Sequence, residues 1–338
     1  MKRYAAGVLL SAVVSITPAF AQTEIARLPR DVFDVIPPAE RVQGDRGSIT
    51  VYQPACRIGA VKDTRRRIVD IAVQEWAVFG FQTIDATSAE AHFLPPGVVP
   101  DRINPPLTAP RIVRHFPRLG ALEDNPSLDT TIAGYWSATP EGSRILAEQN
   151  RAWNAVGRTP INWIEPWSAA FISWVMCEAG LGDMAQFRRS SAHRVYIDQA
   201  IAARDGNAPD AAFVAYDAGE QRIDPGDLLC RSRDGTDYSR LADRRQEFGM
   251  SGATHCDVVV KMDARAGRVL VIGGNVFQSV SLTMLPLTRD RAPFPHPIDK
   301  SAIDGAITIF AHLKLRADAI EASALDNSPA IRALSQGK

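Results

Sequence analysis

The chain has 338 residues, with 38 basic and 38 acidic side chains, so its formal net charge is zero. This balance argues against a protein that binds nucleic acid or an anionic membrane through its overall field, because that mode needs an excess of Lys and Arg. A hydrophobic share of 46% excludes disorder throughout and can fill one large domain or two small ones.

The first 21 residues have the pattern of a secretory signal peptide. Lys2 and Arg3 precede an uncharged run, and Ala19-Phe20-Ala21 supplies the small residues of a cleavage site. The run is short for a bilayer span, which needs about 20 apolar residues, and no later stretch is long enough. We therefore expect a mature chain that starts at Gln22, is periplasmic or secreted, and has no integral membrane segment.

Four cysteines in an oxidising compartment can form two disulfides, with three connectivities. Cys230 and Cys256 both lie in strand-like runs, and neighbouring antiparallel strands would set them side by side. This geometry favours a Cys230–Cys256 bridge and leaves Cys56 with Cys177. The alternative is four buried free thiols that pack as small hydrophobic residues.

Hydrophobic residues recur at helical spacing in the first two thirds of the chain. Residues 22–55 lack such a period, and we interpret them as an extended lead-in. Residues 84–126 contain too much proline for a helix or a central strand, and we interpret them as a long insertion. The predicted helices cover residues 63–80, 128–136, 139–157, 166–180 and 191–204.

The hydrophobic period falls to two in the last third of the chain, which is typical of strands. Helices followed by a mainly antiparallel sheet form an α+β arrangement. The charged segment 232–254 interrupts the sheet, and we interpret it as a lid. Residues 317–338 form a C-terminal tail. The predicted strands cover residues 226–231, 256–262, 268–272, 276–282 and 306–315.

Five short pieces follow one another in the second half of the chain. They are Pro166–Trp174, Ser191–Ile197, Pro225–Leu228, His255–Val259 and Gly273–Val276. Together they resemble the bacterial DUF 2272 family, a domain of unknown function that is similar to the papain-like NlpC and CHAP cell-wall hydrolases. The resemblance covers residues 56–316. It implies a papain-like domain in which a nucleophile at the start of a buried helix meets a histidine on the following sheet.

Ser168 opens the predicted buried helix and occupies the place where the similar hydrolases normally have cysteine. A hydroxyl there would lie at the positive end of the helix dipole, beside free N–H groups that can hold an oxyanion. Serine also caps helices by accepting an orphan N–H, which is the alternative interpretation. His255 begins a strand and is the candidate general base and acid.

Two residues compete to orient the His255 imidazole. The resemblance implies Asn275, which otherwise is a turn residue after the glycine pair 273–274. Asp257 is the rival, because residues two apart on a strand face the same side, whereas Cys256 faces the other. A serine nucleophile needs a carboxylate more than a cysteine does, since exchange of the triad Asp for Asn in a serine protease lowers turnover about 10⁴-fold.

The resemblance suggests that His193 lines the cleft, and we group Trp163 and Trp167 with it as substrate-binding candidates. A surface or capping histidine is the alternative for His193. His92, His115, His296 and His312 lie in proline-rich loops or on the outer face of a strand. No histidine or cysteine has metal-ligand spacing and no phosphate-binding glycine loop is present, so we expect no metal or organic cofactor.

The resemblance thus implies a peptidase or amidase that acts on peptidoglycan or its peptide stems. Ser168 would attack an amide bond, His255 would act as base and acid, and the Ser168 N–H would serve the oxyanion. Asn275 or Asp257 would orient the histidine. The alternative is a catalytically inactive cell-wall binding module of the same fold.

Overall fold

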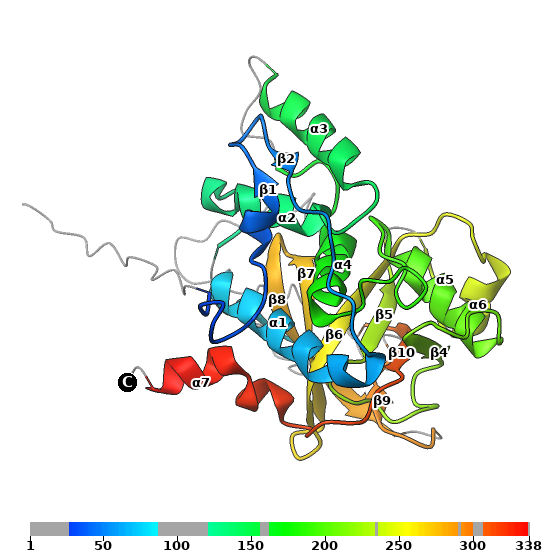
Figure 1. Ribbon diagram of the computed structural model, residues 1–338. Coiled ribbons are helices and arrows are strands. Elements are labelled where there is room, and N and C mark those ends of the chain that lie inside the picture. Colours follow the sequence, from blue (N-terminus) through cyan, green and yellow to red (C-terminus); the bar gives the residue numbers. More distant parts are fainter. Residues whose placement is uncertain are drawn as a thin grey trace, which may run out of the picture.

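The computed structural model describes residues 27–86, 121–155, 162–233, 236–289, 292–299 and 307–336. The predicted signal peptide (1–21) and most of the proline-rich insertion (84–126) lie outside these residues. Helices and a mostly antiparallel sheet form an α+β fold, as predicted (Figure 1).

One large sheet forms the centre of the domain, with the strand order β3-β8-β7-β6-β5-β10-β4. Neighbouring strands pair antiparallel, except that β3 pairs parallel with β8. All five predicted strands are present. Three more were missed because they have only two to four residues. The bounds are β3 Thr83–Asp85, β4 Phe213–Tyr216, β5 Leu228–Ser232, β6 Thr254–Asp263, β7 Arg268–Val276, β8 Ser279–Thr288, β9 His296–Pro297 and β10 Ile309–Leu315.

The five predicted helices are also present, and two of them cover one face of the sheet. α1 and α4 lie across β6 and β7 (Figure 1). α4 is buried at every position, as expected of a helix that is apolar nearly all round. The bounds are α1 Thr64–Val78, α2 Asp129–Trp136, α3 Gly142–Trp153, α4 Ser168–Ala179, α5 His193–Arg204, α6 Leu241–Gln246 and α7 Pro329–Gln336.

The two faces of the sheet contribute to different apolar clusters. Cys256, Val258 and Val260 of β6 belong to the main core between the helices and the sheet. Val259, with Leu229 of β5, belongs to a smaller cluster on the opposite face. Successive residues of β6 therefore point to opposite faces, as in any strand.

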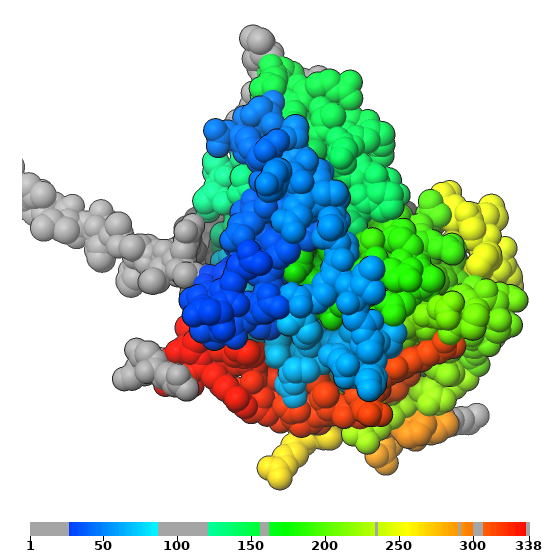
Figure 2. All heavy atoms as spheres, viewed as in Figure 1, coloured from blue at the N-terminus to red at the C-terminus, as the bar shows by residue number. Residues whose placement is uncertain are grey.

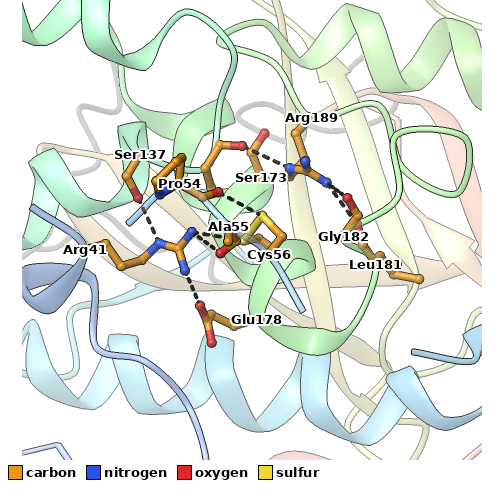
Figure 3. The surroundings of a disulfide bond; sticks show 12 residues. Arg41, Pro54, Ala55, Cys56, Ser137, Ser173, Glu178, Leu181, Gly182 and Arg189 are labelled. Atoms are coloured by element: carbon orange, nitrogen blue, oxygen red, sulfur yellow. Dashed lines mark hydrogen bonds and ion pairs between the residues drawn. A yellow bond between two sulfur atoms is a disulfide. The ribbon is translucent and has the colours of Figure 1, made fainter. Parts of the chain in front are cut away.

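The segment before α1 packs on the surface of the domain (Figure 2) and passes in front of α4 (Figure 1), to which it is bonded through Cys56. Arg41 is fully buried, and its Nη1 lies 2.6 Å from Glu178 Oε1 while its Nε donates to Ser137 Oγ at 2.8 Å (Figure 3). The described part of the predicted lead-in is thus attached to the domain and is mostly without regular structure. That part contains a 3₁₀ helix and a small two-stranded sheet: Pro38–Arg41, β1 Val42–Gln43 and β2 Thr50–Val51.

Both favoured disulfides are present. Cys56 is bonded to Cys177, across a sequence separation of 121 residues, and attaches the N-terminal segment to the end of α4. Cys230 is bonded to Cys256, and the two residues are directly opposed on β5 and β6. Two disulfides are compatible with a secreted or periplasmic protein. Among the helices of the described ranges, none has the length and apolar character needed to cross a membrane.

The predicted lid, 232–254, contains α6 and is attached to α5 by a buried ion pair. Arg244 has no exposed surface. Its Nε lies 2.8 Å from Asp198 Oδ1 and its Nη2 lies 2.7 Å from Asp198 Oδ2. This bidentate contact holds the described part of the segment against the helix that carries His193, and a lid function stays a prediction.

The C-terminal tail packs on α1, and Asp70 provides a test of that packing. α1 contacts both α7 and the 3₁₀ helix Ala324–Asn327. Burial raises the pKa of Asp70 to about 7, and its Oδ1 has no hydrogen-bond partner. At a pH above the pKa that Asp70 has in the unfolded chain, folding must therefore either protonate this carboxyl or bury its charge, and both cost free energy. This penalty grows as the pH rises towards 7 and is complete above it.

We expect Asp70→Asn to raise the free energy of unfolding at pH 8, by at most about 4 kcal/mol, and to leave it unchanged near pH 4. Urea unfolding at the two pH values measures the difference. The matched control is Asp318→Asn, at an exposed position of the same tail. An equal gain at both pH values would contradict the assignment to ionisation.

Candidate functional site

The predicted catalytic residues gather where β6 and β7 separate. Pairing between these strands extends as far as Val258 opposite Ile272. Beyond that point the N–H of Cys256 donates to Nδ1 of His193, at 3.2 Å. His193 is the first residue of α5 and is 4% exposed. Its ring therefore takes the place of a strand partner, and the alternative of a surface histidine is wrong.

Ser168 is the first residue of α4 and is only 3% exposed. Its Oγ lies 2.7 Å from His193 Nε2. The helix begins without a side-chain cap, so the capping alternative for Ser168 is wrong as well. Because the first N–H groups of a helix have no intrahelical acceptor, this hydroxyl lies beside free donors at the positive end of α4.

His255 is paired with Asp257 rather than with Asn275. His255 Nε2 lies 2.7 Å from Asp257 Oδ1, so the two side chains share one face of β6, as their spacing predicts. Burial lowers the pKa of His255, against the opposing effect of Asp257. Burial works to raise the pKa of Asp257, but His255 and the nearby Arg231 lower it overall. The pair is thus a neutral imidazole that donates from Nε2 to a carboxylate.

The other ring nitrogen of His255 has no partner. Nδ1 is buried and makes no hydrogen bond, and the whole residue has no exposed surface. Since Nε2 holds the proton that Asp257 accepts, Nδ1 carries a lone pair. This nitrogen can therefore accept a proton.

Gly273 provides the space for the His255–Asp257 pair. A Cβ at this position would lie 1.8 Å from Asp257 Oδ1 and 2.9 Å from His255 Nε2. At Gly274 a Cβ would lie 2.5 Å from that of Phe171 in α4. Both glycines lie within β7 and not in a turn. Neither position has room for a Cβ, because Asp257 approaches Gly273 from one face of the sheet and Phe171 approaches Gly274 from the other.

Asn275 supports the start of α4. With its amide oriented to satisfy both neighbours, Oδ1 accepts from the backbone N–H of Trp167 at 3.2 Å and Nδ2 donates to Glu123 Oε2 at 3.2 Å. Trp167 Nε1 donates to the same carboxylate oxygen at 2.7 Å, and burial raises the pKa of Glu123. Asn275 has a φ of 53°, which asparagine adopts more readily than most residues. The role implied by the resemblance, orientation of His255, therefore belongs to Asp257 in this structure.

Ser168 and His255 do not hydrogen-bond to each other, and His193 contacts both. The ring centroids of His193 and His255 are 5.0 Å apart. Trp163 and Trp167 are 7% and 0% exposed and pack in the main core. Trp167 stacks on Tyr135 with centroids 5.7 Å apart. Substrate contact by these tryptophans stays a prediction, which their burial does not support.

Glu123 was missed because it lies at the end of the proline-rich insertion, where no pattern distinguishes it. The close approach of His193 to Ser168 was missed because only tertiary structure brings α5 to the start of α4. In the described ranges, no group of three or more His, Cys, Asp or Glu side chains is arranged to hold a metal ion.

The fold and the site define an α+β domain with a buried serine–histidine cluster at the N-terminus of a central helix. A family model, described as an uncharacterized protein conserved in bacteria (DUF2272), matches residues 123–298. The match covers more than half of the chain and contains the whole cluster, so the chain belongs to the DUF2272 family. No curated protein and no solved structure matches it.

Proposed function

We propose that this protein is a serine hydrolase of amide bonds in peptidoglycan peptides, with Ser168 as nucleophile and the His255–Asp257 pair as its base. The observation that carries the proposal is the unpartnered Nδ1 of His255, which has the protonation that a general base requires. The centroid of this ring lies 5.0 Å from that of His193, which in turn bonds Ser168. The substrate class rests on the resemblance to papain-like NlpC and CHAP hydrolases, whose fold we propose for this domain.

The reaction would run through an acyl-enzyme. Ser168 Oγ attacks the amide carbon while its proton passes to His255 Nδ1, and the carbonyl oxygen becomes an oxyanion beside the N–H groups of α4. Collapse breaks the C–N bond, and the amine leaves with the proton from His255. A water molecule then gives its proton to His255 and its oxygen to the acyl carbon. Ser168 leaves as an alkoxide and regains the proton, so the sum is amide plus water to acid plus amine.

The burial of the site favours a second function. Ser168 and His255 are 3% and 0% exposed. His255 also lies on the face of β6 that points away from α4, so turnover requires the site to open and Oγ to approach Nδ1 at the point where β6 and β7 separate. Catalytic hydrogen bonds commonly tighten only in the substrate complex. A domain that never opens would instead be a cell-wall binding module without turnover.

Muropeptide release from purified sacculi separates the two functions. We expect the mature protein to release muropeptides and Ser168→Ala to lose more than about 10⁴-fold in rate, with sacculus binding retained. Ser168→Cys restores the usual nucleophile of the similar hydrolases and should stay active. Ser143→Ala, at an exposed position of α3, is the matched control.

The pH profile adds a second readout. The base must be neutral, and the pKa of His255 lies below its ordinary value of 6.5 because of burial. Turnover should therefore rise with pH and level off below about pH 6.5. A wild-type protein that binds sacculi and never cleaves them would establish the binding module and overturn the hydrolase.

A further inference from the structure

The contacts of His193 determine where its proton lies. The backbone N–H of Cys256 can only donate, so Nδ1 of His193 must be its acceptor. The Tyr196 hydroxyl bonds the same nitrogen, and burial raises the pKa of Tyr196 so that it keeps its proton to donate. Two donors therefore converge on Nδ1.

The imidazole of His193 is also neutral. It is buried, and this burial, with the neighbouring His255, lowers its pKa well below the ordinary value. A neutral ring with a lone pair on Nδ1 carries its single proton on Nε2. Nε2 lies 2.7 Å from Ser168 Oγ, so this proton points at the serine oxygen.

We propose that His193 is a fixed hydrogen-bond donor to Ser168 and not its base, so that the two histidines of the site have different tasks. His193 presents an N–H to Ser168 Oγ, which gains negative charge as its proton leaves and again when it is expelled as an alkoxide, whereas His255 presents a lone pair that receives the proton. The catalytic meaning of this division rests on the proposed hydrolase, but the position of the proton does not.

The donor role explains how serine can replace cysteine at this helix. A serine hydroxyl is far less acidic than a thiol and cannot rest as an anion. A buried N–H aimed at Oγ stabilises the negative charge as it develops, and its orientation is fixed in advance by the strand and by Tyr196. Ser168 then has one donor, His193, and in the proposed hydrolase its proton passes to a separate acceptor, His255, once the site opens.

Nuclear magnetic resonance of the full chain with ¹⁵N-labelled histidine tests the proton position directly. Spectra that correlate each ring nitrogen with the protons on the ring carbons, two bonds away, distinguish the two neutral tautomers. The resonance that is missing from His193→Gln belongs to His193. We expect His193 protonated at Nε2 and still neutral at pH 6. A ring protonated at Nδ1 would overturn the proposal whether or not the protein hydrolyses anything.

Labelling of Ser168 by a fluorophosphonate, in which Oγ bonds to phosphorus and fluoride leaves, tests the role. Removal of a donor to developing charge costs about 100-fold or more, so His193→Leu should label at least about 100-fold more slowly. In His193→Gln the amide N–H can replace the donor, and we expect a rate within about tenfold of wild type. His255→Gln, which removes the base, should not label.

Thermal unfolding of each variant identifies those that fail to fold, and His193→Gln keeps the polar contact that His193→Leu removes. If His193→Gln is as slow as His193→Leu while His255→Gln labels normally, His193 is the base and the proposal is wrong. If the wild type neither labels nor releases muropeptides, the hydrolase is wrong, and the resonance experiment still decides the tautomer.

Discussion

Gly273→Ala is expected to abolish hydrolysis while leaving every proposed catalytic residue in the sequence. The new Cβ would lie 1.8 Å from Asp257 Oδ1, so either the carboxylate or β7 must move. His255 Nε2 would lose its acceptor, and the imidazole would no longer be held in the tautomer that leaves Nδ1 free. We expect at least a 100-fold loss of muropeptide release, and a loss of about 1–3 kcal/mol in the free energy of unfolding from overpacking.

Gly59→Ala is the matched control for this substitution. A Cβ at Gly59 would meet its nearest atom, the carbonyl oxygen of Gly180, at 3.7 Å, which is an ordinary contact. Activity and urea unfolding should both stay close to wild type. Normal muropeptide release by Gly273→Ala would show that the His255–Asp257 contact is not needed for turnover.

Asp227→Ala is expected to lower the free energy of unfolding by about 3–5 kcal/mol, because it leaves the buried Arg65 cation without its carboxylate counter-ion. Asp227 has no exposed surface. Its carboxylate accepts from Arg65 Nη1 at 2.8 Å and from His312 Nε2 at 2.9 Å, and Lys314 Nζ lies 3.1 Å away. Burial works to raise the pKa of Asp227, but His312, Arg65 and Lys314 lower it overall.

The sign of the pH dependence follows from this lowered pKa. Asp227 contributes stability above the pKa of the unfolded chain, near 3.9, and the contribution is lost as the pH falls further. The deficit of Asp227→Ala in urea unfolding should therefore be full at pH 7 and shrink in acid.

Asp326→Ala is the control for Asp227→Ala. Its carboxylate pairs with Lys261 at 2.7 Å but is half exposed, and it should cost less than about 1 kcal/mol. If both variants lost the same free energy of unfolding, burial of the ion pair would not be the cause of the large loss in Asp227→Ala.

The sequence predicted best what depends on local periodicity. The apolar character of α4 and the alternation of the five longer strands identified the main elements. Alternation also placed His255 and Asp257 on one side of β6 and Cys256 on the other, and the favoured pairing of Cys230 with Cys256 is present.

What the sequence could not predict depends on long-range packing. The sequence placed His312 on the outer face of a strand. In the structure His312 of β10 lies opposite Leu229 of β5, which belongs to the smaller apolar cluster, and His312 is buried. The contact of His193 with Ser168 joins residues from two helices, and no spacing encodes how those helices meet. Asn275 was assigned to His255 by resemblance, whereas the end of β7 turns it towards Trp167.

The bond between Cys230 and Cys256 has a consequence for the evolution of the connection between them. Strand alignment shifted by a single residue would send the His255 and Asp257 side chains to the wrong side of the sheet. The disulfide joins directly opposed residues of β5 and β6, so the two strands cannot shift relative to each other. Insertions and deletions between residues 233 and 253 can therefore accumulate without misaligning the imidazole, so this stretch can diversify while His255 and Asp257 keep their positions.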